Sequence, residues 1–336
     1  MEGSCDYGMG TFHTVINIIS LVTIPFFFLC LYCILFKSPK TLGNFKWLMV
    51  NQHIASYIFE AVLGFVKMFF YCGIPGYVVT DHVFITEYIN TKNLFTVFFH
   101  IYLVSVTSTI ALFEFRYVSL MGKTCFFQRY PLIRQLWFCM RYVLLSLVWN
   151  FFWARIALDI EEGKRLYLRK YPDFNCLNSI DIAFELYLIP GDTMRLASLC
   201  ILCAMLIGLE SIFYCSFSVW ILLPFSHRSK TKSEKTRKMQ ITLLRSLLLQ
   251  ELIPIIISYA VPIGSYALAF LTGYINLKLN TLGVYIFVLH DMSSSIAVLL
   301  LNKPYRSFIF SVVPKTSTAS SIMVIRTPRG HVANTS

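Results

Sequence analysis

The chain has 336 residues, of which 57% are hydrophobic and only 14% are charged, with a mean hydropathy of +0.65. Soluble proteins carry about 25% charged residues, so this composition excludes a water-soluble globular domain and predicts a protein that folds in lipid. The net charge of +12 would suit nucleic acid as a partner, but the cations lie where membrane proteins concentrate them, so no nucleic acid is expected.

Apolar segments long enough to cross a bilayer as helices, about 20 residues each, occur seven times along the chain. Charged residues, proline and glycine cluster between these segments, and we find no internal repeat. The first 11 residues carry Glu2 and Asp6 but no Lys or Arg, unlike a cleaved signal peptide. We therefore predict an all-α membrane protein, a seven-transmembrane helix bundle whose first helix is retained. The predicted helices span 12–36, 47–70, 94–115, 136–158, 196–224, 241–271 and 281–301.

Lys and Arg are concentrated in alternate connections between the predicted helices. One set of connections holds 18 basic residues and one acid, and the other holds seven basic residues and 11 acids. Because cytoplasmic loops carry the excess of Lys and Arg, the first set is predicted to be cytoplasmic, with the N-terminus outside and the C-terminus inside. The basic set comprises 37–46, 116–135, 225–240 and 302–336; the other comprises 1–11, 71–93, 159–195 and 273–280.

This orientation divides the chain into three parts. Residues 1–11 form an extracellular N-terminus, and 12–301 form the bundle. The polar segment 302–336, rich in Ser and Thr, is predicted to be a cytoplasmic tail that is mostly disordered.

Five short motifs occur in order along almost the whole chain. Together they resemble the motifs of nematode serpentine chemoreceptors of class H (Srh), with two departures: Phe115 stands where Asn is usual, and Asp291 where Gly is usual. The motifs are Lys37-Ser38-Pro39-Lys40 with Lys46-Trp47, Leu112 to Tyr117, Leu249 to Pro254 with Pro262, Leu289-His290-Asp291, and Asn302 to Arg306.

The resemblance implies a chemosensory G-protein-coupled receptor that detects a small odorant or pheromone-like molecule and activates a heterotrimeric G protein. It also implies a multi-pass protein of the plasma membrane in sensory neurons, in their cilia. The identity of the ligand does not follow from it.

Ionisable side chains within the apolar spans are costly and therefore invite a functional explanation. Glu60 of the second span and Asp291 of the seventh fall at similar depth, near the level of Ser108 in the third. We predict that these three form a polar switch cluster that contains water, and that a cation or proton can be held there. The alternative is that they form hydrogen bonds between helices and merely hold the bundle together.

At the cytoplasmic end, five residues are candidates for G-protein coupling. Glu114 and Arg116 end the third span, where an acid close to an arginine can form an ion pair that holds the inactive state, as rhodopsin-like receptors do with adjacent residues. Arg237 and Lys238 belong to a basic loop that can contact a G protein or anionic membrane lipid. Tyr305 follows the seventh span. The alternative for Arg116 is a simple interfacial anchor.

Aromatic residues gather toward the outer halves of three spans. Phe95, Phe98, Phe99 and Tyr102 recur at helical spacing in the third span. An aromatic lining would suit a small, volatile or weakly polar ligand, and the alternative is that the rings face lipid. The same depth is reached by Tyr266 in the sixth span and Tyr285 in the seventh, which complete the predicted ligand-binding set.

Only three of the ten cysteines, Cys5, Cys72 and Cys176, fall on the predicted oxidising side. A disulfide between Cys72 and Cys176 is predicted, with Cys5–Cys176 as the alternative, since sequence alone does not fix the pairing.

Three other functional classes were weighed. A membrane metallohydrolase needs clustered histidines, whereas His53, His100 and His290 lie in separate spans, so we expect no enzyme, no metal and no other cofactor. A retinal-binding protein needs a Lys within the seventh span, and 281–301 has none. A transporter or ligand-gated channel is the serious alternative, although the chain lacks the inverted repeats common in transporters. The oligomeric state is unknown.

Overall fold

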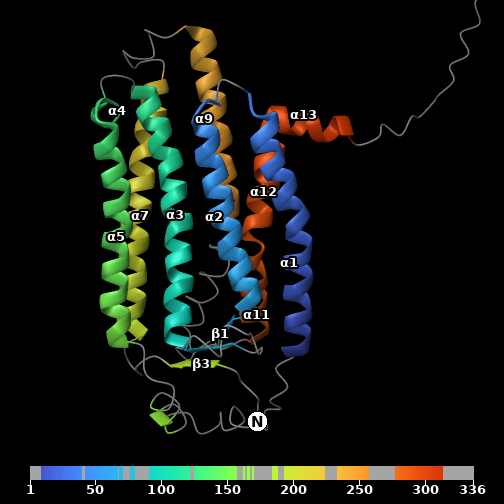
Figure 1. Ribbon diagram of the computed structural model, residues 1–336, viewed down its shortest axis with the longest axis vertical. Helices are drawn as coiled ribbons and strands as arrows, with labels where there is room; N and C mark the ends of the chain where they lie inside the picture. The colour runs from blue at the N-terminus through green and yellow to red at the C-terminus, as the bar shows by residue number, and fades with distance from the viewer. Residues whose placement is uncertain are drawn as a thin grey trace, which may run out of the picture.

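The computed structural model describes ten segments of the chain and four isolated positions between them. Within the described part, long helices run alongside one another, a small sheet lies across one end of the bundle, and a short helix extends outward at the other end (Figure 1). The described residues are 9–39, 42–66, 68–70, 76–79, 91–121, 125–156, 162, 165–166, 169, 184–187, 193–223, 233–256 and 277–312.

The long helices follow one another in chain order. α1 continues into a π-helical turn, η1, and the last long helix is divided into α11 and α12, bent by 41° around Leu289. The bounds are α1 Met9–Tyr32, η1 Cys33–Lys37, α2 Phe45–Val66, α3 Thr91–Met121, α5 Pro131–Ile156, α7 Thr193–Leu222, α9 Glu234–Ile255, α11 Leu277–Val288 and α12 His290–Leu301, with a short α4, Phe126–Arg129, before α5.

The bundle exposes apolar side chains and buries polar ones, as expected of a protein surrounded by lipid. Leu21, Leu144 and Leu209 are each more than 60% exposed, whereas Glu60 and Asp291 are buried. Four of the described helices, α1, α3, α5 and α7, are long and apolar enough to cross a membrane by themselves, and α11 with α12 passes as a broken fifth span.

Several helix ends differ from those expected from hydropathy. α9 begins at Glu234, seven residues before the predicted start, because Ser233 caps it by accepting the backbone N–H of Thr236 at 3.3 Å. α3 continues six residues further, to Met121. Part of the sixth predicted helix, residues 257–271, lies outside the described residues.

A three-stranded antiparallel sheet lies at the end of the bundle opposite α4 (Figure 1). β1 Met68–Phe70 pairs with β2 Gly76–Val79, which pairs with β3 Phe184–Tyr187. The prediction that helix two runs to residue 70 is therefore wrong for its last residues. The apolar pattern continues through 68–70, but the backbone there satisfies its hydrogen bonds in a sheet, and hydropathy does not distinguish these two outcomes.

A further helix, α13 Lys303–Val312, follows α12 and extends outward from the bundle, roughly at right angles to the long helices (Figure 1). Tyr305 is 1% exposed, and its hydroxyl lies 2.6 Å from the Ser38 hydroxyl beyond α1. The Lys37 ammonium lies 4.3 Å from the centre of the Phe308 ring. The predicted tail thus begins with a helix docked on the end of α1, and residues 313–336 lie outside the described part.

Neighbouring helices surround α2. It lies against α1, α3 and α12, while α3 also contacts α5 and α7, and α9 lies between α7 and α12. The approach of α1 to α2 is close because position 64 is glycine: a Cβ there would lie 2.5 Å from the Ser20 hydroxyl and 4.0 Å from Ile16.

We expect Gly64→Val to destabilise the α1–α2 contact by about 1–3 kcal/mol, since a branched side chain at this position must push Ser20 and Ile16 of α1 away from α2. Thermal unfolding of the detergent-solubilised protein measures the effect. Gly208→Val in α7 is the matched control, because a Cβ at position 208 meets no atom within 4 Å. Equal stability of the two variants would contradict this account of the packing.

Candidate functional site

Two buried acids meet where the last long helix is broken. Glu60 of α2 is 3% exposed and Asp291 of α12 is fully buried. The backbone N–H of Asp291 donates to Oε2 of Glu60 at 2.7 Å. Because the first N–H groups of a helix lack partners within it, the bend at Leu289 frees this donor, and the Glu60 carboxylate takes it. The break in one helix is thereby joined to the neighbouring helix.

His53 lies seven residues before Glu60 on α2 and also approaches Asp291. Its Nε2 donates to the carbonyl of Phe27 at 3.2 Å, and its Nδ1 lies 3.8 Å from Oδ1 of Asp291. Within the described residues, Oε1 of Glu60 and both carboxylate oxygens of Asp291 are buried without a hydrogen-bond partner. Two carboxylates so placed are stable only if a proton or a cation compensates their charge.

The third predicted member of the cluster, Ser108, has other partners. Its hydroxyl donates to the Val104 carbonyl at 2.8 Å and lies 2.9 Å from the Asn51 amide nitrogen, which donates to it. A second hydroxyl pair, Ser56 with Ser105, joins α2 to α3 at 2.9 Å. The structure therefore brings Glu60 and Asp291 together and puts Ser108 in a separate polar seam between α2 and α3.

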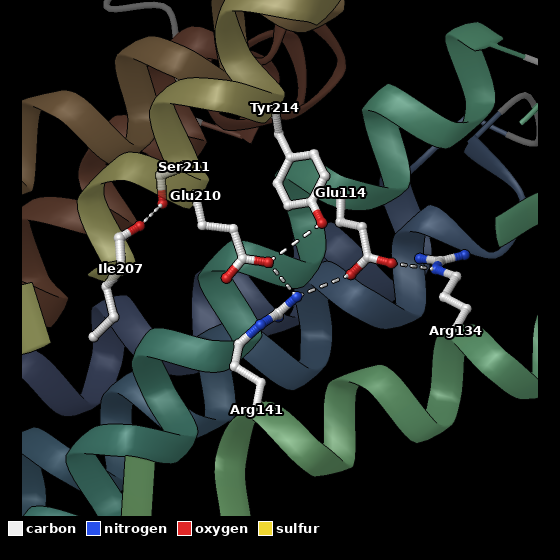
Figure 2. Close-up of polar contacts among 7 residues, drawn as sticks. All are labelled: Glu114, Arg134, Arg141, Ile207, Glu210, Ser211 and Tyr214. Atoms are coloured by element: carbon white, nitrogen blue, oxygen red, sulfur yellow. Dashed lines mark hydrogen bonds and ion pairs between the residues drawn. The ribbon is translucent and has the colours of Figure 1, made fainter. Parts of the chain in front are cut away.

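A second charged cluster joins three helices (Figure 2). Glu114 of α3, whose side chain is 2% exposed, accepts a hydrogen bond from Nε of Arg134 at 3.0 Å and lies 3.7 Å from Nη2 of Arg141. The same Nη2 donates to Oε1 of Glu210 in α7, and the Tyr214 hydroxyl donates to that oxygen at 3.3 Å. Two arginines and two glutamates thus neutralise one another between α3, α5 and α7.

Arg141 is only partly satisfied in this cluster. Its side chain is 6% exposed, and Nε and Nη1 are buried with no hydrogen-bond partner among the described residues. One nitrogen therefore carries both of its ionic contacts, although a guanidinium presents five N–H donors.

The expected ion pair between Glu114 and Arg116 is not formed, and helix geometry explains this correction. Residues two apart on a helix point about 200° away from each other, so Glu114 faces α5 and α7 while Arg116 faces α2. The Arg116 guanidinium carbon lies 4.5 Å from the centre of the Phe45 ring. Its Nε and Nη2 are buried without a hydrogen-bond partner in the described part of the chain.

The other three candidates for coupling lie near the same end of the bundle but are not joined into one site. Tyr305 is held by Ser38, and burial raises the pKa of its hydroxyl to about 12. Arg237 and Lys238 belong to the first turns of α9, where Lys238 pairs with Glu234 at 2.7 Å on an exposed surface.

The aromatic stripe of α3 divides between two neighbouring helices. Phe95 stacks on Trp153 with ring centres 4.6 Å apart, and Phe99 stacks on Trp149 at 3.4 Å, so both face α5. On the other side of α3, Phe98 and Tyr102 lie 4.9 and 5.3 Å from Phe59 of α2.

The remaining predicted ligand-binding residues do not complete one lining. Tyr285 of α11 stacks on Phe12 of α1 at 5.6 Å. Tyr266, like Cys72 and Cys176 of the predicted disulfide, lies outside the described residues. Phe287 of α11 reaches Phe59 at 5.8 Å and joins α11 to the α2–α3 aromatic group.

Sequence reasoning missed Arg134, Arg141 and Glu210, and a signal for them existed. Arg141 and Glu210 are ionisable residues within apolar spans and have opposite charges. Arg134 and Arg141 are seven residues apart, so they share one face of α5. Which acid each arginine meets depends on the rotation of three helices about their axes, which the sequence does not supply.

We expect Arg141→Gln to destabilise the protein by about 3–5 kcal/mol, since it leaves Glu114 and Glu210 with less charge compensation inside the bundle. Lys238→Gln is the control, because an exposed pair within one helix contributes only about 0.3–0.5 kcal/mol. Thermal unfolding in detergent compares the two variants. Similar losses would mean that the three-helix cluster adds no more stability than a surface pair.

The comparisons with known proteins agree with this architecture. The sequence matches the family described as serpentine-type 7TM GPCR chemoreceptor Srh over residues 10–315. No curated protein matches the sequence. The match covers every described helix and most of the chain, so the bundle is a seven-transmembrane one and the resemblance seen in the five motifs is confirmed. The chain belongs to the Srh family of serpentine seven-transmembrane chemoreceptors.

Proposed function

We propose that this chemosensory membrane receptor detects a small odorant or pheromone-like molecule and passes the signal to a heterotrimeric G protein. Membership of a receptor family supports this function and gives no support to an enzyme. We place its action at the plasma membrane of a sensory neuron, in the cilium, because chemosensory detection requires exposure to the surroundings.

The contact between Glu60 and Asp291 is the observation that carries the proposal. It joins α2 to the broken helix α11–α12 through a hydrogen bond from the backbone N–H of Asp291. A carboxylate that gains or loses a proton or cation at this point changes the balance between a bent and a straighter helix. Such a two-state element is what a receptor needs to connect a ligand to a distant partner.

The ligand is proposed to bind at the sheet end of the bundle. Phe98 and Tyr102 of α3 pack against Phe59, which precedes Glu60 in α2, and Phe287 joins α11 to them. The aromatic lining suits a small and weakly polar molecule. Phe95, Phe99, Tyr266 and Tyr285 remain proposed members, and a Cys72–Cys176 disulfide is proposed to brace this end.

The opposite end is proposed to face the cytoplasm and the G protein. Basic residues gather there on several elements, among them Lys46 of α2, Arg129 of α4, Arg237 of α9 and Arg306 of α13. The rule that cations accumulate on the cytoplasmic side favours this orientation. Glu114, Arg116, Tyr305, Arg237 and Lys238 are the proposed coupling residues.

An epitope placed before Met1 should be stained on intact cells, and one placed after Ser336 only after permeabilisation. The physical reason is the cost of translocating the loops rich in Lys and Arg. Both tags are read on the same cells by surface and total staining. If both epitopes stain on intact cells, or neither does, the proposed orientation is wrong.

Ligand-evoked dissociation of a G protein tests the function itself. Cells that express the full chain and an energy-transfer sensor of Gα–Gβγ dissociation are exposed to a panel of small volatile and weakly polar compounds. We expect a response that is absent from cells lacking the receptor. A ligand-evoked ionic current that persists when G proteins are blocked would instead assign the chain to ligand-gated channels.

We expect Glu60→Ala to abolish or strongly reduce this response at matched surface expression, since the acceptor for the Asp291 N–H is lost. Glu60→Gln retains a side-chain acceptor but no charge, and should respond more weakly than the parent. Ser211→Ala is the control, because it removes one hydroxyl of α7 whose partner among the described residues is the Ile207 carbonyl of its own helix. An unchanged response of Glu60→Ala would rule out the switch.

A further inference from the structure

Two phenylalanine rings lie between two arginines near the α4 end of the bundle. Arg116 of α3 lies over Phe45 of α2, with its guanidinium carbon 4.5 Å from the ring centre. Phe45 packs against Phe115 of α3 with ring centres 5.7 Å apart and tilted by 33°. Arg134 of α5 lies over Phe115 at 5.3 Å. The two rings therefore separate one arginine from the other.

The arginine over Phe115 is the one that reaches the acid. Arg134 donates its Nε–H to Glu114 at 3.0 Å while its guanidinium carbon remains within cation–π distance of the Phe115 ring. Glu114 and Phe115 are neighbours in the sequence, so their side chains leave α3 about 100° apart. One guanidinium is thus held at once by a carboxylate and by the adjacent aromatic ring, and Phe45 packs against that ring.

This double contact matters because Arg134 has alternatives. Its side chain is 24% exposed, unlike that of Arg141 at 6%, so water or a lipid phosphate competes for its charge. A long arginine side chain loses rotamer freedom when it is fixed in one geometry. A ring that already holds the guanidinium in place lowers that cost and makes the ion pair with Glu114 more favourable.

We propose that Phe115 is a positioning residue that holds Arg134 on Glu114 and so ties the acid of α3 to α5. Arg116 lies on Phe45, and its Nε and Nη2 have no hydrogen-bond partner among the described residues. The consequence for signalling rests on the proposed function: loosening the α3–α5 tie favours the active arrangement. The positioning role itself does not depend on any partner.

A double-mutant cycle isolates this role. Glu114→Gln, Arg134→Gln and the double variant are compared with the parent by thermal unfolding of the purified full chain in detergent. Each variant is expected to lower the unfolding midpoint. In the parent background, we expect the sum of the two single-variant decreases to exceed the decrease of the double variant by roughly 2–4 °C. The same cycle in a Phe115→Leu background should show no such excess, whereas in Phe115→Tyr, which keeps the ring, it should persist.

The cycle separates positioning from ordinary packing. If Phe115 only fills space, Phe115→Leu lowers the midpoint of every corner alike and leaves the Glu114–Arg134 coupling intact, which would overturn the proposal. If Phe115→Leu does not yield folded protein, Phe115→Met, which keeps an unbranched apolar side chain of similar length, replaces it in the same cycle. Coupling retained in Phe115→Met would likewise overturn the proposal.

Ligand-independent G-protein dissociation gives the second readout. At matched surface expression, Phe115→Leu should signal more without ligand than the parent and Phe115→Tyr. Lost coupling in the cycle without any change in basal signalling would leave the positioning role standing and would count against G-protein coupling at this end. Unchanged coupling with raised basal signalling would overturn the positioning role and would support G-protein coupling at this end.

Discussion

The hydrogen bond from the Asp291 N–H to the Glu60 carboxylate is the contact on which the arrangement of the bundle depends. Lipid cannot hydrogen-bond a free backbone donor, so a helix that breaks inside a membrane must find an acceptor on a neighbour. Glu60 supplies this acceptor, and its own charge then needs a proton or a cation. The broken helix thus depends for its hydrogen bonding on a carboxylate whose charge can change. Through Glu60 and His53 of α2 and Asp291 of α12, the two helices form one unit.

The cluster formed by Glu114, Arg134, Arg141 and Glu210 constrains the other half of the bundle. It fixes α3, α5 and α7 relative to one another by charge, whereas the seam of Asn51, Ser56, Ser105 and Ser108 fixes α2 to α3 by neutral hydrogen bonds. Ion pairs in a poorly polar surrounding are costly to separate one partner at a time. We therefore expect α5 to move together with α3 and α7 as one rigid unit. The neutral hydrogen bonds between α2 and α3 can exchange partners at lower cost.

Hydropathy and charge asymmetry were enough to predict the class of fold, because lipid imposes a strong and simple rule on composition. They were not enough to find β1, since Met68–Phe70 is as apolar as the helix before it. They also missed α13, which is too polar for a membrane span although Tyr305, Phe308, Ile309 and Val312 recur at helical spacing. The depth of Glu60 and Asp291 could be read by counting residues, and these two do meet. The predicted Glu114–Arg116 ion pair was wrong, and Ser108 lies apart from Glu60 and Asp291. Both contacts depend on the rotation of each helix about its axis, which depth alone does not define.

The hydrogen bond between Ser38 and Tyr305 joins residues 267 positions apart in the chain, and α1 also lies against α11 and α12. α1 therefore contacts all of these neighbours only after α11, α12 and α13, which follow it in the chain, have been synthesised. Until then α1 must wait in the membrane with part of its inner face covered by lipid or by insertion factors. The native bundle of this receptor therefore forms only after α11, α12 and α13 have been synthesised. Late translation, and not early insertion, sets the time of its assembly.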